Sequence, residues 1–252
     1  MQLSKYRILS GNALKIIAAV FMMIDHIGVL LLPSVLLLRI LGRLSYPIFA
    51  FMISEGARYT KNKIKYFATV FSLAAVCQIV FYIFSKSLYM CILVTFSISI
   101  LLIYALDAAK RAWFTEGCSY IKRILLTALF VAGVALTYFL NRKVSIDYGF
   151  MGCIAPVFAS LFDFRGMNVP KSLEQLDNIP IRVLTFSIAL IIMAFGSDNI
   201  QFYSLISIIL LLMYSGKRGK YKMKNFFYLF YPLHLVFLEI VYIVIEIIKL
   251  EA

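Results

Sequence analysis

The chain has 252 residues, of which 63% are hydrophobic and only 15% are charged. Soluble domains have an apolar share nearer one half, so this composition excludes a soluble globular protein and indicates a polytopic membrane protein. The net charge of +13 does not indicate a nucleic-acid-binding protein, because the lysines and arginines cluster in short segments between apolar runs. Four cysteines stand singly, without a CxxC pair, so we expect neither a metal site nor a disulfide framework.

Apolar runs of about 15 to 22 residues recur along the whole sequence, and runs of this length are typical of membrane-spanning helices. We therefore expect an all-α protein with one membrane domain over residues 1–252 and about nine transmembrane helices. The two longer loops, 107–119 and 165–180, carry mixed charges and do not predict a separate soluble domain. The expected helices lie at 12–32, 36–57, 64–84, 89–106, 120–140, 149–164, 181–196, 200–214 and 228–248.

The basic residues predict the orientation of these helices. They cluster after the second and fourth expected helices and before the last, which places them all on one side of the membrane. By the positive-inside rule this side is the cytoplasm, so we expect the N-terminus inside and the C-terminus outside. We also expect these cations to contact anionic membrane lipids. The cations on this side are Lys5, Arg7, Lys15, Arg58, Lys61, Lys63, Lys65, Lys110, Arg111, Lys122, Arg123, Arg165, Lys171, Arg182 and those of 217–224.

The first expected helix keeps Lys15, Asp25 and His26 inside its apolar run. Ionisable residues at such depth are costly unless they face a protein interior or a watery cavity, so they are candidates for function. Lys15 and His26 are eleven residues apart, and eleven steps of about 100° return to within about 20° of the same direction. At about 1.5 Å per residue, they are roughly 16 Å apart along the helix. One face therefore presents a cation toward the cytoplasm and an imidazole toward the outside.

Counting residues from the end of each expected helix sorts the polar side chains into two levels. The outer level lies toward the outside of the membrane, and the inner level lies near the cytoplasm. The outer level contains His26, Arg43, Gln78 and Thr95, each about 9 to 11 Å from the outer end of its helix, with Asp147 and Tyr148 at the outer start of the sixth. The inner level contains Lys15, Glu55, Arg58, Tyr231, Pro232 and His234.

Histidine transfers protons near neutral pH, and a neighbouring carboxylate such as that of Asp25 can orient it. The neighbouring Asp25 and the matching depth of Arg43 therefore favour a functional role for His26. Structural explanations stay open for both histidines. His26 can make an interhelical hydrogen bond that only holds the bundle, and His234 can belong to a packed helix start with an aromatic belt.

Four segments carry a resemblance to a known family: LKIIAAVFMMIDHIG, LGRLSYPIFAFMISEGARYT, SIDYGFMG and FYLFYPLHL. From about residue 12 to residue 236 the chain resembles the TraX family, which is named for the membrane protein that N-acetylates conjugative pilin. The spacing of Lys15 and His26 is also similar to the Arg/Lys-x10-His element of membrane acyltransferases that move acetyl groups from cytoplasmic acetyl-CoA to extracytoplasmic sugars. This second resemblance implies that His26 is catalytic and that Lys15 is a donor-side cation.

Together the resemblances imply a multi-pass acetyltransferase of a bacterial cytoplasmic membrane, with acetyl-CoA as acyl donor. The implied acceptor is an extracytoplasmic amine or hydroxyl, carried by pilin or by a glycan. Two alternatives stay open: a transporter or flippase whose buried charges line the substrate path, and a scaffolding protein for surface appendages. We assign His26 and Asp25 to catalysis, Arg43, Gln78, Thr95, Asp147 and Tyr148 to acceptor and oxyanion binding, and Lys15, Glu55, Arg58, Tyr231 and His234 to donor binding.

Overall fold

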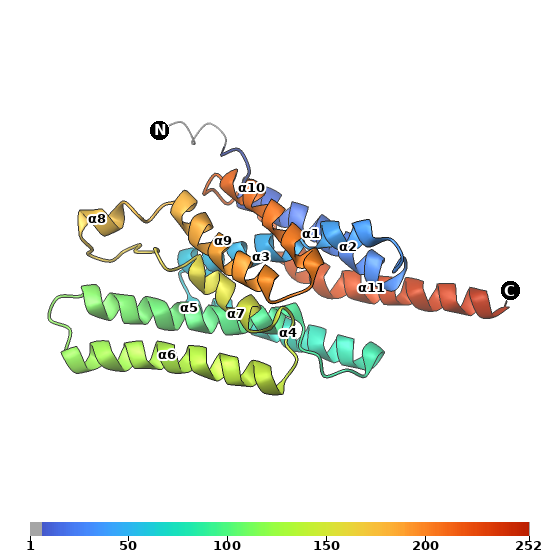
Figure 1. Cartoon of the computed structure of the whole chain (residues 1–252), viewed down its shortest axis with the longest axis horizontal. Coiled ribbons are helices and arrows are strands. Elements are labelled where there is room, and N and C mark those ends of the chain that lie inside the picture. The colour runs from blue at the N-terminus through green and yellow to red at the C-terminus, as the bar shows by residue number, and fades with distance from the viewer. Residues whose placement is uncertain (1–6, 252) are drawn as a thin grey trace. The chain divides into compact units, whose positions relative to one another are not determined.

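The computed structural model describes residues 7–251, so Lys5 lies outside the described residues. Within this range the chain forms helices joined by loops (Figure 1). Its β pairing in the described range is limited to two isolated parallel bridges, Leu9 with Tyr214 and Met90 with Ile146. The predicted all-α fold is confirmed.

All of the predicted apolar segments fall on helices. In the described part of the chain, five segments are long and apolar enough to cross a membrane: α1, the α2–α3 stretch, α4, α5 and α6. The chain is therefore a helical membrane protein, whereas the total of about nine crossings and the cytoplasmic N-terminus stay predictions. The helices are α1 (Gly11–Leu30), α2 (Leu36–Gly42), α3 (Ser45–Tyr59), α4 (Lys63–Ser85), α5 (Ile92–Phe114), α6 (Tyr120–Lys143), α7 (Gly149–Phe158), α8 (Lys171–Glu174), α9 (Ile179–Phe195), the 3-10 helix η2 (Asn199–Ile206), α10 (Ser207–Leu212) and α11 (Lys224–Glu251).

The largest difference from the predicted boundaries is at α5, which continues about two turns past residue 106. Its polar end is stabilised by ion pairs, because the carboxylate of Asp107 contacts both Lys63 and Arg111. The Lys110 Nζ donates hydrogen bonds to three backbone carbonyls just beyond the end of α7. Paired charges can continue a helix that hydropathy alone would end, so the predicted loop 107–119 is wrong over most of its length.

The chain divides into two compact units. The first contains the described residues within 1–49, 76–87 and 194–252, and the second contains Ala50–Ala75 and Leu88–Met193. The predicted single membrane domain over residues 1–252 stays a prediction, and the two units are described separately.

In the first unit, α1 packs against α2 and α11. The Ser10 hydroxyl accepts a hydrogen bond from the backbone N–H of Ala13 and so caps the start of α1. The second predicted helix is broken into α2 and α3 between Gly42 and Ser45. The Ser45 hydroxyl donates to the backbone carbonyl of Ala18 on α1, with an oxygen–oxygen distance of 2.9 Å. This bond fixes the start of α3 against the middle of α1.

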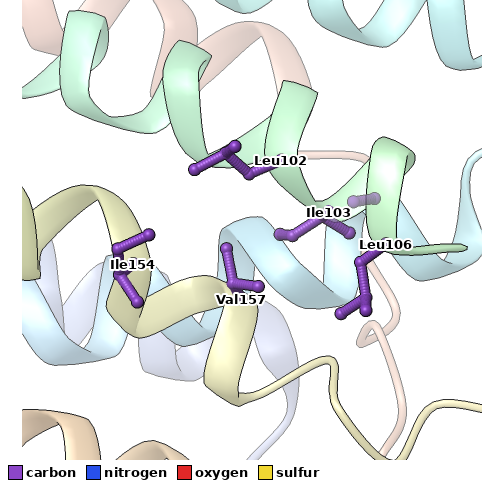
Figure 2. Close-up of a cluster of buried hydrophobic side chains, with 6 residues drawn as sticks. Leu102, Ile103, Leu106, Ile154 and Val157 are labelled. Carbon is purple, nitrogen blue, oxygen red and sulfur yellow. The ribbon is translucent and has the colours of Figure 1, made fainter. Parts of the chain in front are cut away.

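In the second unit, α5 packs against α6 and α7. A cluster of buried aliphatic side chains joins α3, α5 and α7 (Figure 2). In a membrane, the burial of these side chains is favoured by close van der Waals packing rather than by the hydrophobic effect, because lipid tails are as apolar as the side chains themselves. The cluster consists of Ala57, Leu102, Ile103, Leu106, Ile154 and Val157.

The cysteines provide a test of the predicted orientation. Cys118 is half-buried in the loop between α5 and α6, whereas Cys77, Cys91 and Cys153 are buried. If this loop is cytoplasmic, a membrane-impermeant maleimide should label inverted vesicles and leave intact spheroplasts unlabelled. The Cys118→Ser variant should be unlabelled in both preparations. Labelling of Cys118 in intact spheroplasts would reverse the predicted orientation.

Candidate functional site

The two histidines of the chain meet in the first unit. His26 on α1 and His234 on α11 lie in edge-to-face contact, with ring centroids 5.0 Å apart and an interplanar angle of 77°. The predicted separation of these residues into an outer and an inner level is therefore wrong. The start of α11 contributes to this difference, because the helix begins at Lys224 rather than at residue 228 and His234 lies about one turn further along it than hydropathy indicated.

Both imidazoles are held in the same way by their own helices. The Nδ1 of His26 lies 2.8 Å from the carbonyl oxygen of Met22, and the Nδ1 of His234 lies 2.9 Å from that of Phe230. A carbonyl oxygen only accepts hydrogen bonds, so Nδ1 carries the hydrogen in each ring. The neutral rings therefore present Nε2 as a lone-pair acceptor, which is the form that a general base requires.

This tautomer assignment can be checked directly. We expect nitrogen NMR of histidine-labelled protein, under alkaline conditions where imidazoles are neutral, to show a protonated Nδ1 and an unprotonated Nε2 in both rings. The chain has two histidines, so the variants His26→Asn and His234→Asn assign the signals without ambiguity. A protonated Nε2 in either neutral ring would contradict the arrangement.

Asp25 does not orient His26 as predicted, because the Met22 carbonyl occupies Nδ1. The Asp25 carboxylate instead lies 2.8 Å from the Arg39 guanidinium on α2, close enough for an ion pair although the oxygen lacks a well-aligned hydrogen bond. Gly42 makes this approach possible, since a Cβ at that position would lie 2.1 Å from the nearer Asp25 oxygen. The Asp25–Arg39 pair thus depends on the glycine of the LGRLSYP motif and joins α1 to α2.

The other assigned residues of the first unit lie on four helical segments. The Lys15 Nζ lies 5.9 Å from the centroid of the Phe227 ring, and the Tyr231 ring contacts His234 with centroids 5.4 Å apart. Arg43 follows α2 directly, and its buried Nε has no hydrogen-bond partner among the described residues. Gln78 is half-buried on α4. Of these contacts, that of Tyr231 reaches the histidine pair, through His234.

In the second unit, the assigned residues Thr95 and Asp147 hold the start of α7. The Thr95 hydroxyl donates to the backbone carbonyl of Asp147 at 2.8 Å, and the Tyr89 hydroxyl donates to the Asp147 carboxylate at 2.8 Å. Tyr148 has a φ of 58°, a left-handed conformation that is unusual for a residue with a side chain, and it is the N-cap of α7. The structure therefore joins Thr95 of α5 to the turn of Asp147 and Tyr148, and the assignment of these three residues to acceptor binding stays a prediction.

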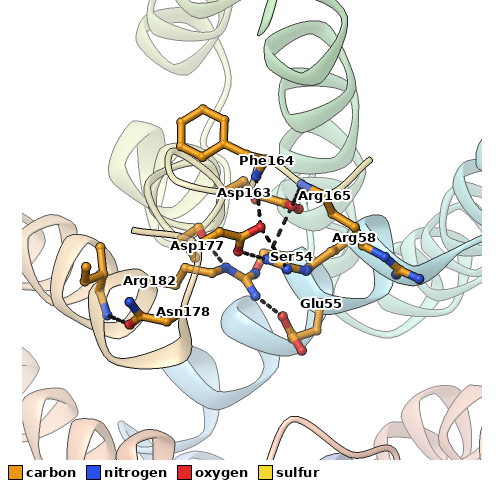
Figure 3. Close-up of polar contacts among 12 residues, drawn as sticks. Ser54, Glu55, Arg58, Asp163, Phe164, Arg165, Asp177, Asn178 and Arg182 are labelled. Atoms are coloured by element: carbon orange, nitrogen blue, oxygen red, sulfur yellow. Dashed lines mark hydrogen bonds and ion pairs between the residues drawn. The ribbon is translucent and has the colours of Figure 1, made fainter. Parts of the chain in front are cut away.

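Glu55 and Arg58 belong to a network of buried charges in the second unit (Figure 3). The Glu55 carboxylate pairs with the Arg182 guanidinium, whose Nε donates to the carbonyl of Ala159 at 2.9 Å. Arg182 was counted among the cytoplasmic cations that were expected to contact lipid, but it is 1% exposed on α9 and is not accessible to lipid head groups. Its side of the membrane stays a prediction. The apolar sequence of α9 around Arg182 did not predict the ion pair with Glu55 on α3.

Arg58 makes a second set of ion pairs in the same network. Its guanidinium lies 2.6 Å from the carboxylate of Asp177 and 3.3 Å from that of Asp163. Asp177 also accepts a hydrogen bond from the backbone N–H of Phe164, at 3.1 Å. The segment after α7 is therefore fixed to α3 by partly buried ion pairs. The predicted helix 149–164 ends earlier, at Phe158, so Asp163 lies beyond it.

The described residues contain no group of three or more His, Cys, Asp and Glu side chains that is suited to a metal ion. The polar groups that the structure shows in the first unit include two imidazoles in contact and the Asp25–Arg39 ion pair. Imidazole is the side chain that most often serves as a general acid or base.

Comparison with known proteins gives one match. No match to this chain was found among curated proteins or among solved structures. The family model described as "TraX protein" matches residues 10–242, which include both histidines and all four of the motif segments. The chain therefore belongs to the TraX family.

Proposed function

We propose that this protein is a membrane acyltransferase that moves an acetyl group from cytoplasmic acetyl-CoA to an extracytoplasmic amine or hydroxyl. The observation that carries the proposal is the arrangement of His26, whose Nδ1 is bonded to the Met22 carbonyl so that Nε2 is left as the base. Membership of the TraX family supports the same reaction class. The acceptor would be the N-terminus of a pilin or a surface glycan, and the location a bacterial cytoplasmic membrane.

The reaction needs one proton to move twice. His26 Nε2 takes the proton of the acceptor N–H or O–H while the acceptor lone pair forms a bond to the thioester carbonyl carbon. The carbonyl π electrons move to oxygen, and on their return the carbon–sulfur bond breaks. The leaving CoA thiolate then takes the proton from His26, which restores the neutral imidazole and gives the CoA thiol and the acetylated acceptor.

The remaining groups of the first unit have proposed roles around this step. Arg43 would stabilise the oxyanion, because its buried Nε has no hydrogen-bond partner among the described residues and is free to donate. Asp25 would act through its ion pair with Arg39 by fixing α2 against α1. Lys15 would attract the charged head group of acetyl-CoA, which stays at the cytoplasmic surface while the pantetheine arm carries the thioester toward His26.

The residues of the second unit take part differently in the proposal. Glu55 and Arg58 are each engaged in buried ion pairs, so we propose that they shape the unit rather than bind the donor directly. The turn of Asp147 and Tyr148, which Thr95 of α5 holds, keeps its proposed role in acceptor binding. Its local hydrogen bonds would hold the turn rigid for binding.

Inverted membrane vesicles provide the test, because their cytoplasmic surface faces the medium. Radiolabelled acetyl-CoA added outside should transfer label to the membrane fraction of vesicles that contain the protein, and not to vesicles without it. Purified protein should also gain thermal stability from acetyl-CoA or CoA. A protein that transfers no label and is not stabilised by either compound, but is stabilised by a transported solute, would be a transporter instead.

A further inference from the structure

The second unit has a pocket beside the loop between α5 and α6, with a volume of about 350 Å³. Pockets for small ligands begin at about 300 Å³, so this one can hold a small polar group. Its lining combines a cation, a carboxylate and two large apolar side chains, namely Arg111, Glu116, Phe114 and Met167. None of these residues has a part in the proposed acyl transfer.

The pocket lies at the level of a membrane surface. α5 ends at Phe114 and α6 begins at Tyr120, and both helices are long and apolar enough to cross a membrane. The short loop that joins them therefore lies at a membrane surface in either orientation of the chain. Trp113 and Tyr120 flank this loop with ring centroids 6.0 Å apart, and the Arg123 guanidinium lies 5.7 Å from the centroid of the Trp113 ring. Such aromatic residues are typical of the depth of lipid head groups, so phospholipid head groups lie beside the pocket.

Arg111 presents a fixed guanidinium to the pocket. Its Nε donates to the Asp107 carboxylate at 3.0 Å, and its terminal nitrogens donate to the carbonyls of Gly166 at 3.2 Å and Arg165 at 3.1 Å. These bonds use three of its five N–H groups, so two stay available to a ligand. The Asp107 carboxylate also pairs with Lys63, so this group of two cations and one carboxylate keeps a net charge of +1. A guanidinium held in this way suits a phosphate.

Glu116 adds a negative charge to the same pocket. It is exposed, and its carboxylate makes no ion pair with any residue in the described part of the chain. A ligand with a phosphate alone would be repelled by this carboxylate, whereas a ligand that also carries a protonated primary amine satisfies both charges. Phe114 and Met167 offer apolar surface to the carbon atoms of such a ligand, and the Phe114 ring is held edge to face against Phe164 with centroids 5.7 Å apart.

We propose that this pocket binds the head group of a zwitterionic phospholipid, with its phosphate on Arg111 and its primary ammonium on Glu116. The basic loops were expected to contact anionic lipids, and the carboxylate of Glu116 is the feature that favours a zwitterion here instead. The pocket is lined both by the loop between α5 and α6 and by the segment that contains Met167. A bound head group would join these two segments and so stabilise the folded protein.

Thermal unfolding of delipidated protein in dodecyl maltoside micelles tests the proposal. Phosphatidylethanolamine, phosphatidylcholine and phosphatidylglycerol, added at equal mole fractions, provide a primary ammonium, a quaternary ammonium and no ammonium. We expect the ethanolamine lipid to raise the unfolding temperature at the lowest mole fraction. Glu116→Gln should weaken binding of the ethanolamine lipid about fivefold, the upper end for a partly exposed ion pair, and should not weaken binding of the glycerol lipid. Arg111→Gln should weaken binding of all three lipids about tenfold, as expected for hydrogen bonds to a charged group.

Arg142→Gln is the matched control, because it removes an exposed arginine from the last turn of α6 and should leave binding of all three lipids unchanged. Equal binding of the three lipids by the unaltered protein would overturn the inference. A preference for the ethanolamine lipid that survives Glu116→Gln would overturn it too, and Glu116→Gln should fold normally because its carboxylate has no ion-pair partner among the described residues.

Two water-soluble compounds separate a lipid from other phosphates. If O-phosphoethanolamine stabilises the unaltered protein as strongly as the lipid does at the same concentration, the pocket binds a soluble phosphorylated amine, and the lipid assignment is wrong. If CoA abolishes the stabilisation by the ethanolamine lipid, the pocket binds the phosphates of CoA, and the lipid assignment is again wrong. Neither compound should have these effects if the lipid is the ligand. These outcomes do not depend on acetyl transfer, so the inference can fail while the proposed function stands, and the reverse.

Discussion

Replacing His26 with asparagine is expected to reduce acetyl transfer by about 10²- to 10⁴-fold, the usual contribution of a general base. Asparagine is the informative substitution, because its amide can donate to the Met22 carbonyl as the His26 Nδ1 does, and it has no basic nitrogen at the position of Nε2. The local packing of α1 should thus survive while the proton acceptor is removed. The measurement is the initial rate of label transfer from acetyl-CoA in inverted vesicles.

Three controls make this result specific. His26→Ala should lose activity to a similar extent, and both variants should be present in the membrane in normal amounts. Both should keep the thermal stabilisation by CoA, because the donor head group is expected to bind at the cytoplasmic end of α1. Cys118→Ser, in the loop between α5 and α6, should retain full activity. Normal activity in His26→Asn would remove His26 from the mechanism and favour the transporter or scaffolding alternative.

Hydropathy predicted the helices well because membrane spans are long, uniform and separated by basic loops. It also identified His26, since an imidazole within an apolar run is conspicuous without any structure. The depth of His234 was predicted wrongly in part because α11 starts at the polar pair Lys224 and Asn225, which hydropathy assigns to a loop. This shift of one helical turn, about 5.4 Å, explains only part of the roughly 16 Å between the predicted levels.

Pairings between distant residues could not be predicted from the sequence. Arg39 and Arg43 are four residues apart and lie on one side of a helix, so spacing did not indicate that Arg39, not Arg43, lies beside Asp25. Arg182 and Glu55 are 127 residues apart. From the sequence, each was expected to lie near the cytoplasmic face of the membrane. Only the folded structure shows that the two side chains form an ion pair. The ionisable candidates could therefore be identified from the sequence, whereas their partners depend on tertiary packing.

Replacing Arg182 with methionine is expected to destabilise the protein by about 3 to 5 kcal/mol, the cost of leaving a buried charge without its partner. Arg182 also donates to the Ala159 carbonyl and lies over the Phe51 ring, at 5.6 Å from its centroid, so these contacts are lost as well. The change in the free energy of unfolding is measured by denaturant titration of the purified protein in detergent.

The matched control is an ion pair that solvent reaches. Lys63 pairs with Asp107 but is 45% exposed, so Lys63→Met should cost less than about 1 kcal/mol. The double substitution Glu55→Met with Arg182→Met removes both buried charges and should recover much of the loss, because no buried carboxylate is then left without its partner.

If Arg182→Met is no less stable than Lys63→Met, the Glu55–Arg182 pair does not hold α9 to α3. If the double variant is no more stable than Arg182→Met, the unpaired carboxylate is not the source of the loss, and the hydrogen bond to Ala159 and the contact with Phe51 account for it instead.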